Sequence, residues 1–168
     1  SICTISVTFG TADANGCLPG QAPDLEIAST ATAVTTATGV TNAANAVGDP
    51  DYDPADVATY AVVGSGDVLT LDLGSIKTNT IGTPTDSARV YFASATDGTN
   101  TTIQVEFSTD NITFAPAGTF TTDLNDGVDA AFAVPVSGVR YIRITRTAGA
   151  NINVDAAQYE TYSCASAL

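Results

Sequence analysis

Apolar and polar residues alternate with a period of two through most of the chain, and this pattern predicts β-strands. In residues 67–74, three leucines alternate with Val, Thr and Asp. Clusters of Asn, Asp, Gly and Pro separate the segments, as turns do. The predicted strands are 1–9, the start of 25–40, 67–74, 87–94, 101–108, 129–136, 139–146 and 152–163. About eight short strands, without a helical period or an internal repeat, predict an all-β sandwich or jelly roll.

The first strand stands apart from the others. Residues 10–24 are rich in Gly, Pro, Asn and Asp and form a long irregular connection. The strand could pack on its own domain or add to the sheet of a neighbouring subunit. We therefore divide the 168 residues into an N-terminal strand and linker, 1–16, and a single β-sandwich domain, 17–168.

The chain is strongly acidic, with 18 Asp and Glu against 5 Lys and Arg and a net charge of −13. Such a surface repels nucleic acid and anionic membranes and attracts divalent cations. The alternative is that the acidity only keeps the protein soluble. No apolar run is long enough to span a bilayer. The first residue is Ser rather than Met, so we expect an export signal to have been removed.

Three cysteines lie close to the two ends of the chain, at Cys3, Cys17 and Cys164. This placement favours a disulfide that joins the ends in an oxidising compartment over a metal cluster. The odd number leaves one thiol spare or bonded to another chain. We therefore expect a secreted or cell-surface protein.

Five segments, in this order, carry a family resemblance: "NAVGDPD…ATY", "LTLDLG", "VEFSTDNITF", "VRYIRI" and "VDAAQYETYSC". Together they resemble the discoidin family, the coagulation factor V/VIII C-type or galactose-binding-like domains, which includes bacterial carbohydrate-binding modules. The resemblance covers roughly residues 25–164 and implies an eight-stranded jelly roll, in agreement with the strand pattern. It also implies a Cys17–Cys164 disulfide with Cys3 spare or intermolecular. Pairing of Cys3 with Cys17 is the alternative, but Cys17–Cys164 closes nearly the whole domain.

The aspartates at 49, 51 and 53 have the D-x-D-x-D spacing of a calcium loop. An EF-hand is excluded, because Pro54 stands where that loop needs Gly and Tyr60 stands where it needs a bidentate carboxylate. The resemblance implies a different, structural calcium site. Its expected ligands are Asp49, Asp51, Asp53, Thr59 and Gln158, the last at the position where the family has Glu. The alternative is a solvated Asp-Pro turn.

The chain has no histidine, which removes the usual triads and the usual general base near neutral pH. Nothing pairs its three glutamates for glycoside hydrolysis, so we predict that it is not an enzyme. The resemblance implies that an arginine could help to hold a sugar, and the candidate ligand contacts are Arg140, Arg146 and Tyr52. The alternative for the arginines is ion pairing with the abundant aspartates.

Candidate glycosylation sites are Asn100 and Asn111, both in N-x-T sequons, and Ser87 in an Asp-Ser-Ala motif. For function, the sequence favours a structural or adhesive module, a subunit or repeat of a cell-surface filament or adhesin that associates with itself or its neighbours. A calcium-stabilised module that recognises glycans is the alternative from a different class.

Overall fold

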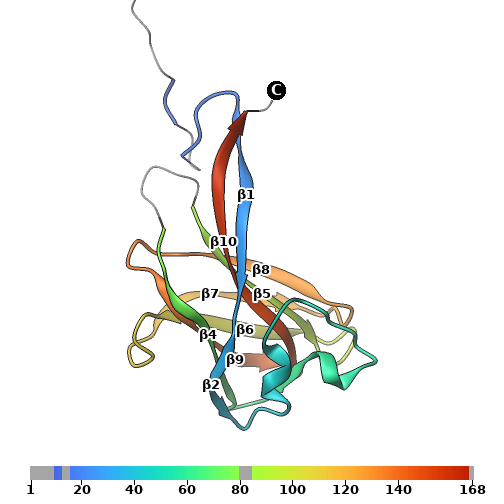
Figure 1. The fold of residues 1–168 in the computed structure, drawn as a ribbon. Helices are drawn as coiled ribbons and strands as arrows, with labels where there is room; N and C mark the ends of the chain where they lie inside the picture. Colours follow the sequence, from blue (N-terminus) through green and yellow to red (C-terminus); the bar gives the residue numbers. More distant parts are fainter. Residues whose placement is uncertain (1–9, 13–15, 80–84, 167–168) are drawn as a thin grey trace, which may run out of the picture.

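The computed structural model describes residues 10–12, 16–79 and 85–166, and its strands form two antiparallel sheets (Figure 1). The first, the β10 sheet, has the order β1 (Gln21–Thr30), β10 (Ile152–Ser166), β5 (Ser87–Ser94), β8 (Val128–Ala133), with β3 (Ala61–Val63) also on β10. The second, the β9 sheet, has the order β2 (Ala33–Thr38), β4 (Val68–Lys77), β9 (Val139–Gly149), β6 (Thr101–Ser108), β7 (Ala115–Thr122). Two 3₁₀ helices, η1 (Ala43–Ala46) and η2 (Val57–Thr59), lie between β2 and β3. The predicted jelly-roll β-sandwich is thereby confirmed.

The core lies between the two sheets and follows from the alternation in the sequence. Every second residue of a strand points inward, so the leucines of β4 and the isoleucines of β9 meet the side chains of β5 and β10. Fully buried members are Leu69, Leu71, Val90, Phe92, Ile103, Val105, Ile142, Ile144 and Ile152. Tyr60, which follows η2, is also buried.

The strand predictions hold best where the alternation is clean. β5 and β6 coincide with residues 87–94 and 101–108, and β9 and β10 extend three residues beyond their predicted ends. The pattern missed β7, the three-residue β3 and also β2, since only the start of 25–40 was predicted as a strand. β7 is an edge strand that contains Pro116 and Gly118, and most of its side chains are exposed, so its sequence carries no apolar alternation. The predicted strand 1–9 lies outside the described residues.

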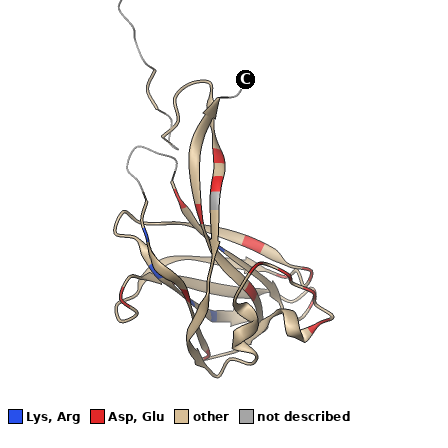
Figure 2. Cartoon of the chain, in the orientation of Figure 1, with Lys and Arg blue, Asp and Glu red and all other residues tan. Residues whose placement is uncertain are grey.

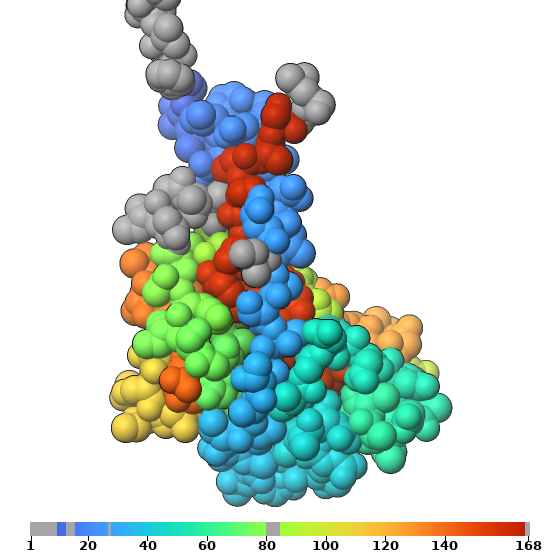
Figure 3. All heavy atoms as spheres, viewed as in Figure 1, coloured from blue at the N-terminus to red at the C-terminus, as the bar shows by residue number. Residues whose placement is uncertain are grey.

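A two-stranded ribbon, formed by Gln21–Glu26 of β1 and Thr161–Ser166 of β10, projects from the sandwich (Figure 3). The pairing of β10 with β5 ends at Glu160, and within the described residues Thr161–Ser166 pair with β1 alone. The side chains of Gln21–Glu26 are all exposed. The ribbon therefore has few apolar contacts of its own.

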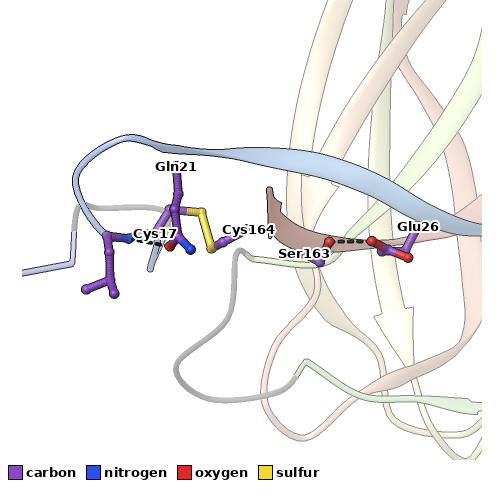
Figure 4. Close-up of a disulfide and its surroundings, with 6 residues drawn as sticks. Cys17, Gln21, Glu26, Ser163 and Cys164 are labelled. Carbon is purple, nitrogen blue, oxygen red and sulfur yellow. Dashed lines mark hydrogen bonds between the residues drawn. A yellow bond between two sulfur atoms is a disulfide. The ribbon is translucent and has the colours of Figure 1, made fainter. Parts of the chain in front are cut away.

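The disulfide between Cys17 and Cys164 closes the outer end of the ribbon, with 5.5 Å between the two Cα atoms (Figure 4). The pairing implied by the resemblance is therefore confirmed. Nearby, the Leu18 amide donates to Oε1 of Gln21 at 3.0 Å, and the Ser163 hydroxyl donates to the Glu26 carboxylate. Cys3 lies outside the described residues.

No helix in residues 10–12, 16–79 and 85–166 has the length and apolar character needed to cross a bilayer.

Candidate functional site

A β-bulge on β10 places an acidic side chain where the strand pattern does not predict one. Val154 pairs with Phe92 and Ala156 with Tyr91, so Asp155 is an extra residue without a partner on β5. A bulge of this kind redirects the side chain at the break. Asp155 consequently accepts a hydrogen bond from the Asp51 amide at 3.1 Å and fastens the loop between η1 and β3 to β10.

This loop, residues 49–60, is here called the Asp loop, and its own hydrogen bonds shape it. The Thr59 hydroxyl accepts from the Asp53 amide at 2.9 Å and donates to the Asp56 carbonyl at 2.8 Å. The carboxylates of Asp53 and Asp56 accept from the Ala55 and Ala58 amides, the second as the cap of η2. Two of the expected metal ligands, Asp53 and Thr59, therefore already form hydrogen bonds that stabilise the turns of this loop.

The predicted calcium ligands do not all come together. Asp53 and Thr59 are joined through the hydrogen bonds of the Asp loop, and Asp49 and Asp51 are exposed nearby. Gln158 instead donates to the Tyr91 hydroxyl at 3.0 Å and to the Glu160 carboxylate at 2.9 Å. In the part of the chain that the structure describes, no three His, Cys, Asp or Glu side chains gather as a metal-binding group. Calcium binding stays a prediction.

A pocket of about 160 Å³ lies between the Asp loop, the bulge and the start of β8. Five of its lining side chains carry polar groups, two of them tyrosines and three of them carboxylates: Tyr52, Tyr91, Asp126, Asp129 and Asp155. They come from four separate segments, the Asp loop, β5, β10 and the β7–β8 connection that continues into β8. Figure 2 shows acidic residues in the loops on the right of the view, where the Asp loop lies.

Tyr52, a candidate ligand contact in the sequence, is fixed at the wall of this pocket. Its hydroxyl donates to the Asn125 carbonyl at 3.0 Å and accepts from the Asn153 amide at 3.1 Å. Its ring lies against Gly127, where an added Cβ would approach the ring to 3.2 Å. Gly127 also has a φ of 101°, which residues other than glycine rarely adopt. Both the close ring and the backbone conformation therefore favour glycine at this position.

Burial sets the electrostatics of the pocket. It raises the pKa of Asp155 to about 6, and the nearby Asp51 carboxylate contributes in the same direction, while the Asp51 and Tyr52 amides act against it. Burial also raises the pKa values of Tyr52 and Tyr91, so both are neutral at physiological pH. No ion pair within the described residues involves Asp155 or Asp126.

Next to the pocket, a hydrogen-bonded network around the buried Glu160 holds Tyr91 and Asp129 in place. Glu160 accepts from Arg89 at 2.7 Å, from Gln158, and from the Tyr162 hydroxyl at 2.6 Å. Arg89 also pairs with Asp129. Sequence reasoning missed this network, because its residues are scattered over three strands and join only in the fold.

The predicted arginines do not reach the pocket. Arg140 forms a two-point ion pair with Asp72, at 2.9 and 3.1 Å, and lowers the pKa of that carboxyl. Arg143 pairs with Glu106 at 2.7 Å. Arg146 donates to the Gly149 carbonyl, and its Nε has no hydrogen-bond partner among the described residues. The ion-pairing alternative is thus confirmed for Arg140.

Of the candidate glycosylation sites, Asn100 is exposed, Asn111 is half-buried with a φ of 61°, and Ser87 is half-buried at the start of β5. Modification at these positions stays a prediction.

The fold of this chain is similar to that of solved carbohydrate-binding modules. A truncated AlyQ with CBM32 and alginate lyase domains aligns over 85% of this chain at 17% identity and a TM-score of 0.57. The CBM32 of AlyQ, in complex with 4,5-unsaturated mannuronic acid, aligns over 82% of this chain and 96% of its own, at 19% identity and a TM-score of 0.52. The chain has the discoidin-like, galactose-binding-like fold.

This fold confirms the resemblance seen in the sequence. The chain covers 34% of the longer AlyQ structure, which also contains a lyase domain. No family model matches the chain. No curated protein matches it either.

Proposed function

We propose that the protein is a non-catalytic module that binds a glycan in the pocket between Tyr52 and Tyr91. The observation that carries the proposal is the combination of two tyrosine side chains with carboxylates in one concave site. Binding sites typically combine an aromatic surface with a few polar groups that fix orientation. A sugar ring offers an apolar face to the tyrosines and hydroxyl donors to the carboxylates.

The size of the pocket suits one sugar unit. At about 160 Å³ it is smaller than the roughly 300–1,000 Å³ of sites that hold drug-sized ligands. One ring or one terminal residue of a longer glycan would fill it, with the remainder of the chain lying outside. Binding of this kind is weak for a single site, in keeping with a module that works beside other domains or copies.

The test is a glycan array with amino, neutral and acidic glycans, followed by titration calorimetry of the best ligand. We expect Tyr91→Ala to weaken binding at least tenfold, because it removes one aromatic wall. Tyr141→Ala is the matched control, since Tyr141 is half-buried on β9 and does not line the pocket. The absence of binding to every glycan class, or an equal loss in both variants, would refute the proposal.

A second function, assembly into a surface filament or adhesin, is supported by the ribbon. Among the described residues Thr161–Ser166 have no strand partner on the side opposite β1, although the Asp86 carboxylate accepts from the Tyr162 amide there, and such an edge accepts an added strand. We propose that residues 1–9 of a neighbouring copy, which alternate as a strand does, are donated to this edge. The disulfide fits an oxidising compartment, as secretion or surface display would require.

Light scattering of the full chain tests assembly. We expect concentration-dependent oligomers that disappear when residues 1–9 are deleted. A monomer at all concentrations would refute this second function and leave glycan binding unaffected.

A further inference from the structure

We propose that the Tyr52–Tyr91 pocket selects saccharides that carry a protonated amine and discriminates against uronic acids. The inference rests on the proposed glycan binding and specifies the chemical class of the ligand. It follows from the pocket itself, from the distribution of charged groups around it, and from the ion pairs that the few arginines form.

The pocket is a half-open hollow lined by three carboxylates, of which only Asp129 has a basic partner, Arg89, among the described residues. Asp126 and Asp129 contribute carboxylates from the β8 end, and Asp155 contributes a third from the bulge. Asp155 is only 3% exposed, and its carboxylate accepts a hydrogen bond from the Asp51 amide of the Asp loop. A buried carboxylate without a counter-charge is costly, and a bound cation would relieve that cost.

Three of the four arginines form ion pairs, and none of these pairs involves Asp155. Arg89 pairs with the lining residue Asp129 and with the buried Glu160. Arg140 and Arg143 pair with Asp72 and Glu106 in the β9 sheet. The fold thus neutralises other buried carboxylates, but within the described residues it provides no basic partner for Asp155.

An ammonium group matches what the pocket offers. It donates up to three hydrogen bonds, and bonds between an ammonium and a carboxylate are shorter and stronger than neutral ones. Tyr52 and Tyr91 line the same pocket, and an ammonium over either ring would gain a cation–π attraction. A uronic acid instead would bring a carboxylate toward Asp126 and Asp155, which have no basic partner among the described residues, in a chain of net charge −13, and this opposes binding.

The experiment compares three ligands of equal length: a glucosamine trimer, its fully N-acetylated counterpart and a mannuronate trimer. Titration calorimetry is carried out with EGTA present, so that adventitious metal does not contribute. We expect the glucosamine trimer to bind at least tenfold more tightly than the N-acetylated trimer, the change that one charge-assisted hydrogen bond produces. We expect no measurable binding of the mannuronate trimer.

Two variants separate local recognition from long-range charge. Asp126→Asn removes a carboxylate from the pocket at an exposed position, and we expect it to reduce the preference for the amine about tenfold. Asp24→Asn makes the same change of charge on the ribbon and should leave the preference unchanged. An equal effect of both variants would overturn the proposal in favour of non-specific attraction.

The remaining outcomes distinguish this inference from the proposed function. If the N-acetylated or mannuronate trimer binds as tightly as the glucosamine trimer and Tyr91→Ala abolishes binding, the pocket is a glycan site and the selectivity is refuted. If none of the three ligands binds and no other glycan does, both proposals fail together.

Discussion

Asp155 and Glu160 both lie on β10, and each is 3% exposed. Their pKa values are nevertheless shifted in opposite directions. Burial alone would raise the pKa of Glu160, but hydrogen bonds from Arg89, Tyr162 and Gln158 outweigh it and lower that pKa. Asp155 has backbone donors but no ion pair with any described residue, and burial raises its pKa to about 6. The comparison teaches that burial does not decide the charge of a carboxylate; its partners do.

The largest expected loss of stability comes from removing the basic partner of Glu160, so that this buried carboxylate, like Asp155, has no ion pair among the described residues. Arg89→Met removes the cation and leaves a buried carboxylate uncompensated, so we expect a loss of about 3 kcal/mol in the free energy of unfolding at pH 7. The loss should shrink as the pH falls, because the unpaired Glu160 then becomes protonated. Urea denaturation across pH 4–8 measures both effects. A loss below 1 kcal/mol at pH 7 would mean that solvent reaches Glu160.

The second change removes the charge of Asp155, the buried carboxylate that has no ion pair among the described residues. Because its pKa is raised in the folded state, its contribution to stability is intact below about pH 4, falls as the pH rises to about 6, and stays low above that. Asp155→Asn keeps an oxygen that can accept from the Asp51 amide. We expect this variant to be more stable than the wild type by about 2–3 kcal/mol at pH 7 and to match it near pH 4.

Denaturation of the two proteins in parallel, with EGTA present, isolates this contribution from those of the other carboxylates. A variant that is less stable than the wild type at pH 7 would show that the ionised carboxylate of Asp155 is needed to hold the Asp loop.

A smaller effect on stability is expected if a calcium ion binds at Asp155. Asp51, one of the expected calcium ligands, adjoins Asp155, which was not among them, and a calcium ion held between the two would supply a cation to Asp155. At ten times its dissociation constant it would add about 1.4 kcal/mol, a rise of about 3–5 °C in Tm. Thermal unfolding with calcium and with EGTA measures this, and Asp155→Asn should abolish the rise. An unchanged Tm in the wild type would contradict the calcium prediction.

The smallest effect is expected at the other sheet. Arg143→Met removes the same kind of partner from Glu106, but the side chains of Arg143 and Glu106 are 30% and 16% exposed. Water can therefore solvate the remaining carboxylate, and we expect a loss of about 1 kcal/mol or less. Urea denaturation of Arg143→Met and Arg89→Met in parallel measures the two losses in the free energy of unfolding. Equal losses would show that the burial of the carboxylate does not determine the size of the loss.

The parts of the fold that alternate cleanly were predictable, and the site was predictable only in part. β5 and β6 follow from strict alternation, and Tyr52 was a candidate contact. Asp155 could not be found, since a bulge reverses which side chains face outward and leaves no mark in an apolar–polar pattern. Gln158 was selected by its place in a motif, but its distance along β10 from the bulge gives it other partners.

The disulfide at the end of the ribbon also determines how the protein would carry mechanical load. Cys17 and Cys164 are 147 residues apart in sequence and covalently joined. A force applied between the segments that precede Cys17 and follow Cys164 passes through this bond and bypasses the sandwich. The pocket would keep its shape under tension, whereas in reducing conditions the same force would pull β1 and β10 apart from the ribbon inward.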